Sequence, residues 1–510
     1  MNAERTVVVG LDGAGFDLLD SWLEEGKLPT IARVMDSGVR GQLESVLPPV
    51  TSPNWKAYAT GKNPGKIGIY WWENIDVANR RVYYPSERKQ TNTEYWEILA
   101  NESDVGVIGV PTTYPPKRVG SFFVSGAPDA EETGYTHPPE LESELESELG
   151  YRVLKQNRIK DDTNAAAEEI LDLIDLRFKA AKYLDRQYNV DFLQIATFYL
   201  NSLHHYLWDD DYTLEAWQLI DNHLADFVDD ETNIILMSDH GSNPIGTVFY
   251  INTWLAENGY LELTRDSPGF LYKFGIQKDR LARVFNRLGV KQAAKRMAPQ
   301  SLLNRIPDEE GIFKREQKTN KIDWEQSTAV ASGQGPIYLT MDPDDPEREI
   351  VREELKTKLG ELTDPELRQI ATEIVDGRDA YNGEYIDESP DIVIDQAAGV
   401  HIPGGIGKEE VFTIPTEEGW KAENRRYGLF AASGPDMGTG TVDGLSILDL
   451  APTLLHLHGC PVPSSMDGQV VTDIFDPQSK AVSKAINRQA ETLQAQELKR
   501  VRQIARRLDL

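Results

Sequence analysis

Short apolar runs alternate with longer amphipathic stretches along this chain. Runs of four to eight residues that end near Gly, Asp or Asn predict buried strands, and apolar residues at helical spacing between them predict helices. An alternation of strands and helices favours an α/β fold with a mostly parallel, doubly wound sheet. The strands are expected at 6–10, 191–198, 233–237, 335–340, 391–394 and 427–433, and the helices at 16–25, from 28 onward, 165–188, 214–227, 347–362 and 450–458.

Two stretches, 270–306 and the C-terminal 476–510, depart from this pattern. Segment 270–306 carries nine Lys or Arg and one acid, with apolar residues at roughly helical spacing. It is either a solvated basic face or a cap that steers an anionic substrate, for which Lys278 and Arg280 are candidates. The predicted organisation is a core in two parts, 1–264 and 331–475, with a helical basic cap inserted at 265–330 and an amphipathic C-terminal helix at 476–510.

The charge balance narrows the class of partner. The chain has 53 Lys and Arg against 83 Asp and Glu, a formal net charge of −30. Such a charge argues against binding a nucleic acid polymer, because little offsets the repulsion of the phosphates. An acidic, well-hydrated surface is typical of halophilic proteins, in which concentrated salt screens the self-repulsion. An ordinary acidic enzyme is the alternative.

Cysteine content and the N-terminus indicate the compartment. Cys460 is the only cysteine, which excludes an intrachain disulfide and a thiolate metal cluster. The first residues show no signal-peptide pattern, and no apolar run approaches the ~20 residues that a membrane span needs. We therefore expect a cytoplasmic protein without a transmembrane segment, for which a peripheral contact through the basic cap or the C-terminal helix stays open.

Polar side chains of the kind that bind metals follow three of the predicted strands. They are Asp12, the set Asn201, His204 and His205, and the pair Asp239 and His240. In an open parallel sheet the carboxyl ends of the strands share one edge, so we expect these segments to meet there. Carboxylate together with imidazole favours a divalent metal such as Zn or Mn.

A fourth segment supplies a candidate nucleophile. Pro53 suits the first position of a helix, which places Thr51 or Ser52 at or near the N-cap. Such a hydroxyl either caps the helix or acts as a nucleophile where free N–H groups attract a phosphate-like anion. Asn54 is expected to donate to a non-bridging oxygen of that anion. Further along, Trp72 either stacks on a ring of the substrate or packs in a core.

As an ordered set these motifs resemble the alkaline phosphatase superfamily. The residues that carry the resemblance are Leu11-Asp12-Gly13, the segments 50–55 and 60–66, and Ser238-Asp239-His240-Gly241. The closer similarity is to the type I phosphodiesterase/nucleotide pyrophosphatase branch, in particular its predicted phosphohydrolase/phosphomutase group. The resemblance runs from about residue 6 to 475. It implies a three-layer α/β/α sandwich and hydrolysis of a small nucleotide-, sugar- or lipid-linked phosphate ester.

The resemblance also implies a two-metal site around a Thr or Ser nucleophile. One metal is bound by the Asp after the first strand, the nucleophile and an Asp-His pair, and the second by an Asp, a His four residues later and a late His. The corresponding residues here are Asp12, Thr51, Asp239 and His240 for the first metal, and Asn201, His205 and Asn424 for the second.

The second set departs from the family pattern. Asn201 stands where an Asp is expected and Asn424 where a His is expected. An amide oxygen binds a divalent ion more weakly than a carboxylate does. Three interpretations stay open: an esterase with one firmly bound metal and a doubtful second one, a sulfatase-like or phosphotransferase/mutase enzyme that uses a single metal, and a pseudo-enzyme.

Overall fold

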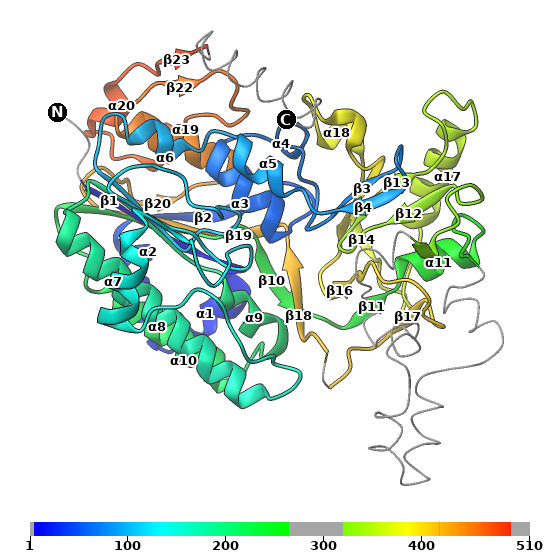
Figure 1. Ribbon diagram of the computed structural model, residues 1–510, viewed down its shortest axis with the longest axis horizontal. Coiled ribbons are helices and arrows are strands. Elements are labelled where there is room, and N and C mark those ends of the chain that lie inside the picture. The colour runs from blue at the N-terminus through cyan, green and yellow to red at the C-terminus, as the bar shows by residue number, and fades with distance from the viewer. Residues whose placement is uncertain (1–4, 265–319, 418, 491–510) are drawn as a thin grey trace. The chain divides into compact units, whose positions relative to one another are not determined.

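The computed structural model describes residues 5–264, 320–417 and 419–490, and they form two compact units (Figure 1). The first unit is drawn from 1–69, 86–243 and 421–510, and the second from 70–85 and 244–420. The predicted cap, with Lys278 and Arg280, falls almost entirely on 265–319, outside the described residues. In the part of the chain that the structure describes, no helix is both long and apolar enough to cross a bilayer.

The first unit is built on a mixed, mostly parallel ten-stranded sheet. The central strands are parallel, and Gly10 pairs with Ala196 on one side and Met237 on the other. Three strands therefore end in line at one edge. The order is β20-β2-β19-β9-β1-β8-β5-β6-β7, with β21 beside β2. The strands are β1 (Arg5–Leu11), β2 (Val39–Glu44), β5 (Val105–Ile108), β6 (Phe122–Val124), β7 (Thr136–His137), β8 (Phe192–Thr197), β9 (Thr232–Met237), β19 (Tyr427–Ser433), β20 (Gly440–Thr441) and β21 (Leu445–Ser446).

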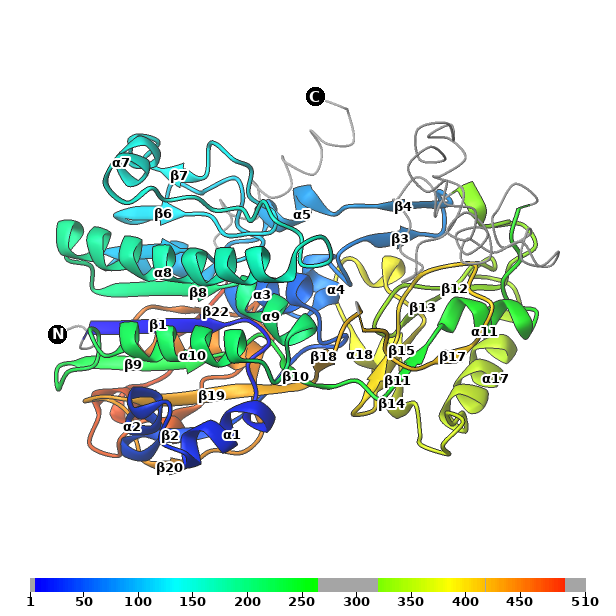
Figure 2. The same ribbon diagram turned by 90° about the horizontal axis from the view of Figure 1, so that it is seen from below.

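Helices cover both faces of this sheet, as Figure 2 shows. Along β1, Val7 and Val9 face one core and Val8 the other, because successive side chains of a strand point to opposite faces. The first core is covered by α1 (Phe16–Glu24), α2 (Pro29–Ser37), α7 (Glu140–Leu149), α8 (Thr163–Tyr188), α9 (Tyr199–Tyr206) and α10 (Asp211–Leu224). The second is covered by α3 (Thr51–Thr60), α6 (Tyr95–Leu99) and α19 (Ile447–Leu457). The predicted three-layer sandwich is confirmed.

The second unit has its own small sheets and its own core. Several of its elements were predicted as strands or helices of a single core, and the structure groups them separately. An antiparallel sheet runs β12 (Ala329–Ala331), β13 (Pro336–Leu339), β15 (Ile392–Gln396) and β14 (Ala371–Asp376), and a second runs β16 (Val400–His401), β11 (Thr247–Phe249) and β17 (Phe412–Thr413). With them lie the hairpin β3 (Asn74–Asp76) and β4 (Arg81–Tyr83) and the helices α11 (Ile251–Glu257), α17 (Arg348–Gly360) and α18 (Gly377–Ala380).

Two predicted helical segments, the cap at 265–330 and the C-terminal helix at 476–510, lie only partly within the described residues. Between 476 and 490 the chain forms one short helix, α20 (Lys480–Ser483), and then β23 (Arg488–Gln489), because its backbone pairs with β22 (Val462–Pro463). In the last residues of the predicted cap, Ile322 bridges Leu263, a turn follows at 324–326, and β12 begins at Ala329. Residues 491–510 lie outside the described part.

A buried charge network fixes α3 within the first unit. All ten residues of α3 are buried, and the ammonium of Lys56 lies 2.5 Å from Glu94 Oε1 with both side chains at most 1% exposed. Glu94 precedes α6, accepts a hydrogen bond from Trp96 Nε1 and lies 3.4 Å from the Lys117 ammonium. Burial lowers the pKa of Lys56, and the charge of Glu94 opposes that shift. This ion pair therefore joins α3 to the segment that begins α6.

Removing one partner of this pair should destabilise the protein. Lys56→Met leaves the Glu94 carboxylate buried with only the more distant Lys117 beside it, and we expect the free energy of unfolding to fall by about 3 kcal/mol. Lys179→Met is the control, because Lys179 is half exposed in its ion pair with Asp175 and should change stability by less than about 1 kcal/mol. Denaturant unfolding measures both, and equal changes would contradict the assignment.

Candidate active site

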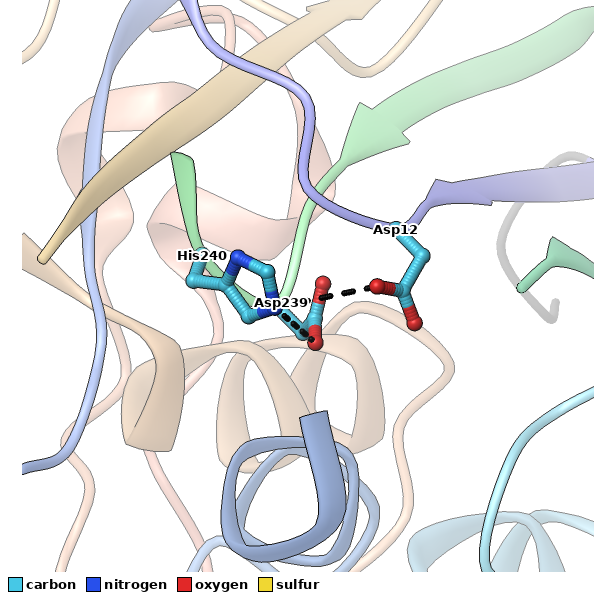
Figure 3. A group of neighbouring side chains, drawn as sticks. All are labelled: Asp12, Asp239 and His240. Atoms are coloured by element: carbon cyan, nitrogen blue, oxygen red, sulfur yellow. Dashed lines mark ion pairs between the residues drawn. The ribbon is translucent and has the colours of Figure 1, made fainter. Parts of the chain in front are cut away.

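Three side chains converge where β1 and β9 end. Asp12 follows β1, and Asp239 and His240 follow β9 after a single serine. All three are fully buried and point toward one another in Figure 3. His240 Nε2 lies 3.2 Å from Asp239 Oδ2 and 3.7 Å from Asp12 Oδ1. Among the described residues this is the group of three acidic or histidine side chains that can hold a metal ion.

The hydrogen bonds around the group fix which atoms face its centre. His240 Nδ1 lies 2.9 Å from the Gly241 carbonyl, so this nitrogen carries the proton and Nε2 presents a lone pair. Asp239 accepts a hydrogen bond from the Gly13 N–H through Oδ1. Its Oδ2, which accepts no such bond, faces the imidazole. Asp239 Oδ2 therefore faces an imidazole nitrogen that carries no proton of its own.

Electrostatics make this arrangement costly without a cation. Burial, together with the charge of Asp239, raises the pKa of Asp12 well above its usual range. Burial raises the pKa of Asp239 to about 8 and lowers the pKa of His240. In the described part of the chain neither carboxylate forms an ion pair with a Lys or Arg. Two carboxylates and one imidazole suit a divalent metal such as Zn or Mn, so these residues fit such an ion.

Thr51 lies beside this group as the first residue of α3. Its Oγ1 is 3.2 Å from His240 Nε2 and 3.3 Å from Asp12 Oδ1. The helix begins two residues earlier than the sequence indicated, so Pro53 occupies its third position rather than its first and Val50 is the N-cap. Proline is tolerated there because N–H groups of the first turn lack intrahelical partners.

Asn54 holds the loop that precedes α3. Its Oδ1 accepts from the Val46 N–H, and its Nδ2 lies 3.0–3.2 Å from the carbonyls of Val46, Pro48 and Val50. The side chain is fully buried, and these acceptors take up both amide hydrogens. Asn54 therefore fixes the loop that leads to Thr51, and its donation to a substrate oxygen stays a prediction.

Of the residues expected at the second metal, Asn201 and His205 lie on α9 and Asn424 on β18 (Ala422–Arg425), all in the first unit. Asn201 Oδ1 has no hydrogen-bond partner and presses on Gly13, where a Cβ would come within 2.3 Å of it. His205 Nδ1 lies 2.8 Å from the Ala422 carbonyl, and Asn424 Nδ2 donates to the Pro49 carbonyl. Binding of a second metal by Asn201, His205 and Asn424 stays a prediction.

Two other candidates differ in what the structure says of them. His204 accepts a hydrogen bond from Trp217 Nε1 and stacks on that ring, and burial lowers its pKa to about 3. It is therefore a neutral structural residue rather than a helper at the metal. Trp72 is half-buried in the second unit, and its substrate contact stays a prediction.

Comparison with known proteins identifies the family. Residues 6–427 match the family described as type I phosphodiesterase / nucleotide pyrophosphatase. The chain belongs to this family. It is thus a phosphohydrolase of the alkaline phosphatase superfamily. A search of curated proteins found no match.

Solved structures show the same fold. Phosphonoacetate hydrolase from Sinorhizobium meliloti 1021, in complex with phosphonoformate, is 15% identical with a TM-score of 0.57, and the match covers 88% of this chain and 94% of that one. Its complex with phosphonoacetate gives 14% identity and a TM-score of 0.54 over the same shares. Human ectonucleotide pyrophosphatase / phosphodiesterase 5 also matches, at 14% identity and a TM-score of 0.49 over 93% of this chain and 100% of that chain.

One residue of this phosphodiesterase-family site had no role assigned from sequence. Trp55 donates from Nε1 to Asp12 Oδ2 over 2.8 Å. The available signal was its position in the Thr51–Trp55 motif, one helical turn beyond the nucleophile candidate. Helical spacing alone did not show that its ring reaches back to the end of β1.

Asp239→Asn should stabilise the metal-free protein. In the unfolded chain Asp239 ionises near pH 4, but in the fold it keeps its proton up to about pH 8. The wild-type carboxyl therefore costs stability progressively as pH rises from 4 to 8, whereas an amide does not. Denaturant unfolding in the presence of a chelator should show a variant more stable than wild type at pH 8, with the gap closing toward pH 4. A gap that does not change with pH would contradict this.

Proposed function

We propose that the protein hydrolyses phosphoric esters, diesters in preference to monoesters, with Thr51 as the nucleophile. The observation that carries this is the position of Thr51 Oγ1 within 3.3 Å of both Asp12 Oδ1 and His240 Nε2. A hydroxyl is a weak nucleophile until a neighbouring group takes its proton or a metal lowers its pKa. A metal site beside the Thr51 hydroxyl would supply this activation, which supports Thr51 as the nucleophile.

The chemistry divides between the chain and the ion it would hold. A metal bound by Asp12, Asp239 and His240 would act as a Lewis acid and lower the pKa of the hydroxyl. Thr51 Oγ1 attacks phosphorus and gives up its proton to solvent, the bond to one alcohol breaks, and that alcohol leaves with a proton from water. The threonine then carries the phosphate with its remaining ester group, and attack by water on phosphorus releases the phosphate monoester and restores the Thr51 hydroxyl. The loop held by Asn54 keeps the hydroxyl at the entrance of α3.

The start of α3 also supports phosphate binding. Val50 N–H already bonds the Pro48 carbonyl, Pro53 has no N–H, and Asn54 N–H bonds the Val50 carbonyl. The N–H groups left for an anion in this turn are those of Thr51 and Ser52. These N–H groups lie at the positive end of the helix dipole, which favours binding of a phosphate oxygen next to Thr51.

We further propose that one metal is held firmly and the second weakly. The three-residue group has two carboxylates and an imidazole, whereas Asn201 and Asn424 contribute neutral amides. This favours a working hydrolase that uses mainly one ion. Phosphate diesters are the substrates to test first, and small phosphonates belong in the same screen because phosphonoacetate hydrolase shares the fold.

Replacing Thr51 tests the nucleophile. Thr51→Ala should lower kcat for bis(p-nitrophenyl) phosphate by about 1,000-fold or more while metal content stays close to wild type, and Thr51→Ser should keep measurable turnover. Ser52→Ala is the matched control, because Ser52 is the adjacent buried hydroxyl and has no hydrogen-bond partner. Turnover retained in Thr51→Ala and lost in Ser52→Ala would reassign the nucleophile.

Restoring the second ligand set tests the proposed metal stoichiometry. Asn201→Asp combined with Asn424→His supplies a carboxylate and an imidazole, and we expect bound Zn or Mn to rise from about one toward two per chain. Elemental analysis after dialysis in molar salt measures this, with each single variant as a control. An unchanged metal content in the double variant would show that these side chains do not face a common ion.

A further inference from the structure

Trp55 donates a hydrogen bond to one oxygen of Asp12, and the other oxygen faces the candidate site. The indole Nε1 donates to Oδ2 over 2.8 Å, and both residues are fully buried. The second oxygen, Oδ1, lies 3.3 Å from Thr51 Oγ1 and 3.7 Å from His240 Nε2. The two oxygens of this carboxylate therefore have different partners, one a fixed donor and the other the candidate metal and nucleophile site.

The fold around the indole gives the ring one place to lie. At Gly10 a Cβ would come within 2.3 Å of Trp55 Cη2 and 3.0 Å of Cζ3, so the ring occupies the space that any other side chain there would need. Tyr58 packs edge-on against the indole with ring centroids 5.8 Å apart. Because Gly10 lies on β1 two residues before Asp12, which follows that strand, the ring is held against the end of β1 next to the ligand.

We propose that Trp55 is a positioning residue that makes Asp12 a one-oxygen metal ligand. By occupying Oδ2 it leaves Oδ1 as the oxygen that faces the ion and Thr51. This inference rests on the proposed metal site and adds what decides its coordination. Asp239 shows the same division, since Gly13 N–H holds its Oδ1 and Oδ2 faces His240.

One-oxygen coordination has a consequence for the choice of metal. Zn²⁺ favours four ligands that include nitrogen, whereas Mn²⁺ accepts more oxygen ligands. With both carboxylates restricted to one oxygen, the group offers two oxygens and one nitrogen, a set that suits Zn²⁺. Freeing Asp12 Oδ2 would let the carboxylate rotate or bind through both oxygens, which favours Mn²⁺ relative to Zn²⁺.

Trp55→Phe tests the role of the N–H donor through metal affinity. Loss of a hydrogen bond to a ligating side chain typically weakens metal binding 10- to 100-fold, and we expect the Kd for Zn²⁺ to rise by about that factor. The Kd for Mn²⁺ should rise less, so the preference for Zn²⁺ over Mn²⁺ narrows. Competition against a chromophoric chelator measures the Kd for Zn²⁺, and electron paramagnetic resonance of free Mn²⁺ measures the Kd for Mn²⁺.

Trp96→Phe is the matched control. Trp96 is equally buried in the same core, and its Nε1 donates over 2.9 Å to Glu94 Oε2, a carboxylate outside the candidate site. This variant should lose comparable stability in denaturant unfolding but keep the wild-type Kd for Zn²⁺. If Trp96→Phe weakens Zn²⁺ binding as much as Trp55→Phe does, general loosening of the core explains the effect and the proposal is overturned.

A third variant keeps the indole and moves it. Gly10→Ala places a methyl group where the Trp55 ring lies, and it should weaken Zn²⁺ binding in the same direction as Trp55→Phe. It serves the test as well if Trp55→Phe does not fold. A Kd for Zn²⁺ unchanged from wild type in the folded variants overturns the role of Trp55. Absence of Zn²⁺ and Mn²⁺ binding in the wild type itself would instead overturn the proposed function.

Discussion

The convergence of Asp12, Asp239 and His240 at the edge of the central sheet is the interaction on which the rest of the site depends. Two carboxylates and an imidazole lone pair are buried together without a lysine or arginine partner among the described residues. The raised pKa values of both acids show what this costs in the absence of a cation. When a divalent ion binds, its positive charge offsets the repulsion between the two carboxylates, and the three side chains become its ligands.

The surrounding fold serves this convergence by fixing one oxygen of each acid. The Gly13 N–H holds Asp239 and the Trp55 indole holds Asp12, so the two remaining oxygens face the same space. The helix that carries Trp55 also carries Thr51 at its start. The buried Lys56–Glu94 pair then anchors that helix to the segment before α6. One helix thus connects the nucleophile candidate, the orientation of a ligand and a buried ion pair.

The residues that correspond to the second metal site of the family differ from its pattern in their ligand atoms. Asn201 and Asn424 stand where the family pattern has an acid and an imidazole, and a neutral amide lacks the charge of the one and the nitrogen ligand of the other. The neighbouring imidazole of His204 is held by Trp217. The chain therefore combines an intact first ligand set with a neutral second one, which is the basis for proposing a hydrolase that depends mainly on one metal.

The sequence by itself determined four strands of the central sheet, at 6–10, 191–198, 233–237 and 427–433, several of the helices between them, and the residues that follow β1 and β9. Buried parallel strands are continuous apolar runs and their ends carry polar residues, so local patterns suffice to find Asp12, Asp239 and His240. Tertiary structure alone decided the separate second unit, the strand at 488–489 and the hydrogen bonds of Asn54. Each depends on partners distant in sequence, or on how the backbone of a loop is satisfied, as with the carbonyls of Pro48 and Val50 around Asn54. Trp55 is the clearest case, because its contact with Asp12 exists only where α3 packs over the end of β1 and Gly10 leaves room for the ring.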